Sequence, residues 1–165
     1  MFLQFFIVTL SALFFFGFVA LGVKKFGLLS CYSAYAPCWD YLKPNPWQLV
    51  TIFSAFLLVP VLLEGAKDSI YQCFGFLAPM FLTFVGATPD YQKDKVAFIL
   101  HQIGAWGTVA FVIAYSFIFH LTWIILAIFV VAMIVAFIQG FKKYWMFWGE
   151  MAMYLSLYLI LYVII

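Results

Sequence analysis

Charge is scarce in this sequence, and arginine is absent altogether. Only 8% of the 165 residues are charged, whereas 68% are hydrophobic and 23% are aromatic. Soluble domains carry about 25% charged residues, so this chain cannot cover a water-facing surface. With a net charge of only +2, the composition excludes a nucleic-acid binder, a soluble globular domain, a disordered chain and a disulfide-stapled secreted module.

The motifs of soluble-cofactor chemistry are also missing. The chain has no Gly-x-Ser-x-Gly elbow, no phosphate-binding loop, no dinucleotide fingerprint, no Cys-x-x-Cys and no His-x-x-x-His. We therefore expect no cofactor and no metal site. Without arginine there is no bidentate clamp for phosphate or carboxylate, so lysines, hydroxyls or backbone amides would have to bind any anionic headgroup.

Long apolar runs dominate the sequence. About 20 apolar residues cross the hydrocarbon core of a membrane, and charged clusters, prolines and glycines separate such runs here. They predict an all-α transmembrane bundle, a single domain over residues 1–165 with no soluble domain. The six expected spans are approximately residues 2–23, 46–64, 69–88, 96–116, 119–139 and 144–165.

The least obvious boundary lies between the fourth and fifth spans. No charged residue occurs from Val96 to Gln139, and one helix of that length would be about 65 Å long. That is about twice the thickness of the hydrocarbon core. We therefore expect a turn near His120.

The lysines predict the orientation. Seven of the eight lie in the loops around Lys24, Lys93 and Lys142, and only Lys67 lies on the other side. The positive-inside rule then makes those three loops cytoplasmic and both termini non-cytoplasmic. We expect a bacterial inner (cytoplasmic) membrane protein. The first span lacks a basic leader segment and a small-x-small cleavage site, so we interpret it as a retained helix.

Two ionisable residues fall inside the expected spans, and both are candidates for a site because burying them is costly. His101 lies six residues past Lys95, and Glu150 lies seven past Lys143. Both are therefore about 9–10 Å inward from the same membrane face. We expect them to face each other and share a hydrogen bond, in either a functional or a purely structural role. The alternative is that each separately hydrogen-bonds a Tyr, a Ser or a backbone carbonyl inside the bundle.

Other polar residues converge on the same face. The candidate catalytic residues are His101, Glu150 and Asp90, and the candidate ligand-binding residues are Ser30, Tyr32, Ser33, His101 and Glu150. Cys31 and Cys38 lie in the same first loop and should be free thiols if that loop is cytoplasmic.

The fourth span carries a stripe of small residues. Gly104, Gly107, Ala110 and Ala114 recur at helical spacing, and such stripes allow membrane helices to approach closely. We expect this helix at the centre of the bundle, with His101 facing inward.

Several short motifs resemble those of a loose superfamily of six-helix membrane proteins, which includes the damage-regulated autophagy modulators and uncharacterised bacterial relatives. The motifs are Ser30 and Ser33, then Gly86-Ala87-Thr88-Pro89-Asp90, then His101-Gln102-Ile103-Gly104-Ala105. The resemblance covers about residues 26–116. It implies a six-helix bundle, a polar pocket under the first loop and a role around lipids. The eukaryotic relatives would place the first loop on the non-cytoplasmic side, opposite to the lysine pattern.

Three functions stay open. The first is a non-enzymatic membrane protein that binds a lipid or another apolar ligand, or that serves as a membrane component of a larger assembly. The second is an intramembrane enzyme that acts on a lipid through His101 with Glu150 or Asp90. The third is a small oligomeric transporter or channel. The expected partners are membrane lipids and either further copies of this chain or another membrane protein, with no nucleic acid.

Overall fold

The computed structural model describes residues 2–67 and 70–165, and this part of the chain is helical with no strand. This confirms the predicted all-α class. The α-helices are α1 (Phe2–Phe26), α2 (Pro46–Gly65), α3 (Gln72–Ala87), α4 (Lys95–Ile118) and α5 (Thr122–Ile164). Two short 3-10 helices, η1 (Tyr32–Tyr35) and η2 (Pro37–Trp39), lie between α1 and α2.

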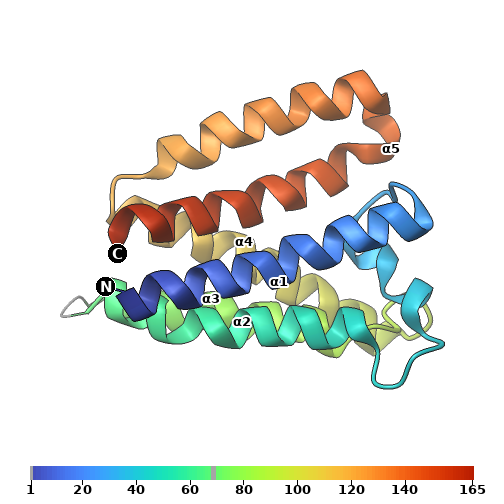
Figure 1. Ribbon diagram of the computed structural model, residues 1–165, viewed down its shortest axis with the longest axis horizontal. Coiled ribbons are helices and arrows are strands. Elements are labelled where there is room, and N and C mark those ends of the chain that lie inside the picture. Colours follow the sequence, from blue (N-terminus) through green and yellow to red (C-terminus); the bar gives the residue numbers. More distant parts are fainter. Residues whose placement is uncertain (1, 68–69) are drawn as a thin grey trace.

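Helix α5 is folded back on itself at Gly140. The backbone there has φ 114° and ψ 83°, which is not helical and which glycine adopts without a steric penalty. Residues 122–139 form an outer arm and residues 141–164 an inner arm, and Figure 1 shows the two arms running antiparallel. The break predicted between the last two spans is therefore confirmed.

A second reversal separates α4 from α5. His120 has φ 55°, and the backbone N–H of Leu121 donates to the carbonyl oxygen of Ser116 at 2.9 Å. The turn expected near His120 is present. The start of α2 also fits the sequence, because Pro46 occupies its first position and the Asn45 side chain caps it by accepting from Trp47 N.

Within the described part of the chain, four helices, α1, α2, α4 and α5, are long and apolar enough to cross a membrane by length and composition. Helix α3 is apolar but has only 16 residues. Its predicted start at residue 69 lies outside the described residues. The chain is thus an integral membrane protein built as a helical bundle.

Helices that follow one another in the sequence run antiparallel along one long axis (Figure 1). The described termini lie at one end, which we call the termini end. The α1–α2 connection, the α3–α4 connection and the Gly140 turn lie at the other, which we call the loop end. Seven of the eight lysines lie in these loop-end segments or within three residues of them.

The α4 glycines pack against α3. A Cβ added to Gly104 would lie 2.7 Å from the carbonyl oxygen of Phe81, and one added to Gly107 would meet the Phe81 ring. The expectation of a central α4 is wrong, however, because its other face is exposed, including Trp106 at 69%. Small residues permit a close approach to one neighbour, which does not require neighbours all round.

Candidate functional site

The connection between α1 and α2, residues 27–45, folds into the loop end of the bundle. Tyr32, Ser33 and Tyr35 of η1 are all buried. The Tyr32 hydroxyl hydrogen-bonds Thr51 Oγ1 at 2.8 Å, and Trp47 Nε1 donates to the Tyr32 carbonyl oxygen at 3.2 Å. Burial also raises the pKa of the Tyr32 phenol above its usual range. The η1 part of the first loop therefore belongs to the packed core, whereas other residues of the loop, such as Tyr41 and Leu42, are exposed.

His101 hydrogen-bonds through both ring nitrogens. Its Nε2 lies 2.9 Å from Ser33 Oγ, and its Nδ1 lies 3.2 Å from Thr88 Oγ1. The ring of Tyr91 stacks on the imidazole, with centroids 4.1 Å apart and an interplanar angle of 13°. His101 and Ser33 are each only 4% exposed.

The partners of Thr88 determine the tautomer of His101. Thr88 Oγ1 donates to the Phe84 carbonyl oxygen at 2.8 Å, with the Val85 carbonyl oxygen at 3.1 Å. Because a hydroxyl has one hydrogen, Thr88 must accept from His101 rather than donate to it. His101 therefore carries its proton on Nδ1, and its Nε2 lone pair accepts the hydroxyl hydrogen of Ser33.

Glu150 reaches the same loop from the inner arm of α5. Its Oε2 accepts a hydrogen bond from the backbone N–H of Tyr32 at 2.6 Å. The expected direct hydrogen bond between His101 and Glu150 does not occur among the residues that the structure describes. Instead, each binds one of two adjacent residues, Ser33 and Tyr32. Counting residues along the two helices correctly predicts that His101 and Glu150 lie at similar depth. It does not predict that the first loop lies between them.

Asp90 lies outside this cluster. It is exposed and accepts from Lys93 Nζ at 2.8 Å, while Lys93 also reaches Asp40 at 3.3 Å. The hydrogen bond from Lys93 holds the pKa of the Asp90 carboxyl below its usual range. Asp90 therefore acts here as an ion-pair partner on the surface, where such pairs contribute little to stability.

Ser30 contributes through its backbone. Its side chain is exposed, and its carbonyl oxygen accepts from Phe147 N at 3.0 Å, which ties the first loop to the inner arm.

Thr88 and Tyr91 were not among the site residues predicted from the sequence. Burial raises the pKa of Tyr91 to about 12, so this phenol stays protonated at neutral pH.

Cys31, Cys38 and Cys73 are free thiols. Burial raises the pKa of both Cys31 and Cys38, and the Glu150 carboxylate raises that of Cys31 further. In the described part of the chain, no group of three or more His, Cys, Asp and Glu residues is arranged to hold a metal ion.

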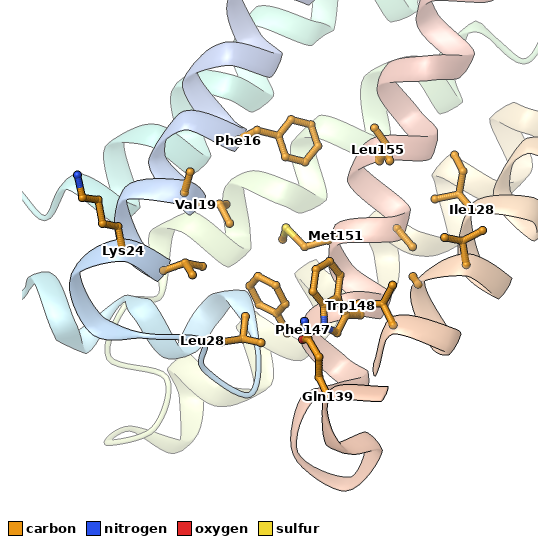
Figure 2. Close-up of a pocket in the computed structure, with 16 residues that line it drawn as sticks. Phe16, Val19, Lys24, Leu28, Ile128, Gln139, Phe147, Trp148, Met151 and Leu155 are labelled. Atoms are coloured by element: carbon orange, nitrogen blue, oxygen red, sulfur yellow. Dashed lines mark hydrogen bonds between the residues drawn. The ribbon is translucent and has the colours of Figure 1, made fainter. Parts of the chain in front are cut away.

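An apolar groove of about 770 Å³ lies between α1 and the two arms of α5 (Figure 2). We call it the α1–α5 groove. It is lined by Phe16, Val19, Ala20, Val23, Lys24, Leu28, Ile128, Val131, Ala132, Val135, Gln139, Phe147, Trp148, Met151, Ala152 and Leu155. The Lys24 ammonium points away from the groove, so that residue contributes mainly its aliphatic stem.

The polar end of the groove is at the Gly140 turn. Gln139 Oε1 accepts from Trp148 Nε1 at 2.9 Å, and this orients the amide nitrogen as a further donor. The α1 lining runs from Phe16 to Lys24 and the outer-arm lining from Ile128 to Gln139, about 12 Å and 17 Å of helix. The groove thus has the length of about half the hydrocarbon core, which is about 30 Å thick.

The groove and the first loop share a wall. Phe147 and Met151 line the groove and belong to the hydrophobic cluster that contains Tyr32 and Tyr35. Glu150, which accepts the hydrogen bond from Tyr32 N, lies between Phe147 and Met151 in the sequence, on the same turn of the inner arm.

No protein-family model, curated protein or solved structure matches this chain. The resemblance to the six-helix superfamily therefore stays a prediction. Function has to be argued from the geometry of the bundle.

Proposed function

We propose that this protein binds a membrane lipid by holding one acyl chain in the α1–α5 groove. The observation that carries the proposal is that the length of the groove matches the thickness of one leaflet. The apolar groove of about 770 Å³ runs from the loop end over about half of the hydrocarbon core. Ligand sites commonly have volumes of about 300–1,000 Å³, so the groove suits a chain-like ligand.

Affinity in such a groove cannot come from the hydrophobic effect alone, because the surrounding lipid tails are equally apolar. It would come from packing against the buried side chains of Phe147, Met151 and Ala152 and from polar contacts at the end. Gln139 supports this reading, because it lines the groove and its amide nitrogen can donate to a carbonyl or phosphate oxygen of a lipid.

The proposal includes the number of membrane crossings and their orientation. Six crossings would count α3 and each arm of α5 separately, with the loop end cytoplasmic in a bacterial inner membrane. The seven lysines in or near the loop-end segments support this orientation. The groove would then open to the cytoplasmic leaflet, and its ligand would be a lipid of that leaflet.

The test uses native mass spectrometry of the protein purified in a mild detergent, with added phosphatidylglycerol of defined chain length. Ala20 is exposed and lines the groove, so Ala20→Phe should fill the groove without disturbing the core. Ala127→Phe is the matched control, because Ala127 is exposed on the outer arm and does not line the groove.

We expect one retained lipid on the wild type and on Ala127→Phe, and at least a tenfold loss on Ala20→Phe. Lipid at about 100 times its dissociation constant should stabilise the wild type by about 2.7 kcal/mol. Equal lipid retention by the two variants would contradict the proposal, because annular lipid does not depend on the groove.

A further inference from the structure

We infer that Ser33 and His101 form a nucleophile–base pair that takes an acyl group from an ester of a membrane lipid. This activity goes beyond lipid binding in the α1–α5 groove and uses a different part of the bundle. The observation is the 2.9 Å contact between Ser33 Oγ and His101 Nε2, with both residues buried.

The hydrogen bonds around His101 are arranged as a nucleophilic serine requires. Such sites combine a nucleophile, a base within hydrogen-bond reach and a third group that orients the base. Thr88 is the third group, because it accepts from Nδ1–H and so leaves the Nε2 lone pair directed at the Ser33 hydroxyl. The opposite tautomer would have placed a hydrogen between Nε2 and Ser33 and removed the base.

The depth of the pair fits a lipid ester. His101 lies six residues inside Lys95, the first residue of α4, which corresponds to about 9 Å along the helix axis. Each headgroup layer adds about 5–8 Å to the hydrocarbon core. The pair therefore lies near the boundary between headgroups and hydrocarbon, where the acyl esters of glycerolipids are located.

Tyr91 separates the pair from the surface. Its ring stacks on His101 at 4.1 Å and also lines a hollow of about 490 Å³ with Gln92, Lys93, Asp94, Lys95 and Phe98. A substrate would enter through this hollow as Tyr91 rotates away from the imidazole. The ammonium group of Lys95 suits the phosphate of an anionic phospholipid, whereas Lys93, which pairs with Asp90 and Asp40, would have to exchange one of these carboxylates for the phosphate.

The reaction needs only an ester and an acceptor alcohol or water. Ser33 Oγ bonds to the acyl carbon while its proton moves to His101 Nε2. The bond between that carbon and the glycerol oxygen then breaks, and His101 returns the proton to the leaving alkoxide. Water, or the hydroxyl of a second lipid, releases the acyl group from Ser33 by the same steps, giving a free fatty acid or a new ester.

The experiment is covalent labelling with a long-chain alkyl fluorophosphonate, on the full chain in phosphatidylglycerol nanodiscs, with peptide mapping by mass spectrometry. We expect one adduct, on Ser33. His101→Gln should slow labelling by about 100-fold or more, and Tyr91→Ala should accelerate it by uncovering the pair. Ser30→Ala is the matched control and should label at the wild-type rate, because the Ser30 side chain is exposed and Ser30 meets the inner arm only through its carbonyl oxygen.

Peptide mapping of the labelled wild type shows whether Ser33 is the nucleophile, even where a variant fails to fold. Labelling of no serine, or of another serine in preference to Ser33, would overturn the inference. A Ser33 adduct that forms equally fast in folded His101→Gln would also overturn it, because His101 would then be a structural partner only. Lipid retention in the groove and Ser33 labelling are measured separately on the wild type, so failure of the groove proposal is distinguishable from failure of this one.

Discussion

The carboxylate of Glu150 accepts a 2.6 Å hydrogen bond from the backbone N–H of Tyr32, 118 residues away in sequence. The bond gives the backbone N–H of a buried residue its partner, and leaving such a group unpaired is costly. It attaches the inner arm of α5 to the first residue of η1, immediately before Ser33. The position of the first loop therefore depends on a helix near the other end of the sequence.

Replacing Glu150 tests this attachment. Glu150→Gln keeps an acceptor oxygen and should cost less than Glu150→Ala, which leaves the Tyr32 N–H without its partner and should destabilise the fold by about 1–3 kcal/mol. Thermal unfolding in detergent measures the stability, and hydrogen exchange of the first loop measures its opening. Glu64→Ala is the control, because among the described residues the Glu64 side chain forms only an exposed pair with Lys67 at 3.4 Å and its loss should change stability by less than about 1 kcal/mol. Equal effects at the two positions would show that the Tyr32 contact is unimportant.

Gly104 should be intolerant of even a methyl group. In Gly104→Ala the new Cβ would lie 2.7 Å from the carbonyl oxygen of Phe81 and 2.9 Å from the backbone nitrogen of Val85. Since backbone cannot rotate away, α3 and α4 must separate, at an expected cost of about 1–3 kcal/mol. Gly17→Ala is the control, because nothing lies within 4 Å of an added Cβ there, and it should stabilise α1 by about 0.5–1 kcal/mol. A Gly104→Ala variant as stable as the wild type would contradict the close packing of α3 and α4.

The thiols of Cys31 and Cys38 should react slowly with iodoacetamide at neutral pH. Burial raises the pKa of both, so less of each is the reactive thiolate, and alkylation should accelerate as the pH rises toward the raised pKa values. Glu150→Gln removes a charge that raises the pKa of Cys31, so it should accelerate Cys31 selectively, as measured by peptide mass spectrometry. Cys38, whose pKa is raised by burial and by Asp40, serves as the internal reference. An unchanged ratio of the two rates would show that Glu150 does not act on Cys31.

The orientation can be tested with single cysteines. Lys93→Cys and Lys67→Cys, each in a background without the native cysteines, place a thiol at the loop end and at the termini end. An impermeant maleimide added to intact cells should label the Lys67 position and spare the Lys93 position until the cells are opened. Labelling of both from outside would contradict the six crossings, and the reverse pattern would place the first loop on the non-cytoplasmic side.

The sequence was sufficient to predict the helical class and the positions of most reversals. Runs of apolar residues and the breaks at Gly140 and His120 are local signals, because bilayer thickness limits how far a helix can continue. The site was predicted only in part. Counting residues along a helix gives the depth of His101 and Glu150, but it does not show that η1 lies between them or that Thr88 fixes the imidazole.

The α1–α5 groove could not be predicted at all. Its lining residues, such as Ile128 and Leu155, have the same composition as residues that face lipid. Whether they form a groove depends on the angles between α1 and the two arms of α5, and these angles follow from contacts made along the whole bundle.

Gly140 does not line the groove, yet its backbone sets the angle between the two walls that do. At φ 114°, any residue with a side chain would be strained, and relief of that strain would tilt the outer arm relative to the inner arm. The width of the α1–α5 groove therefore depends on a turn that does not line the groove. Selection for a thicker or thinner ligand would act on the hinge as well as on the lining.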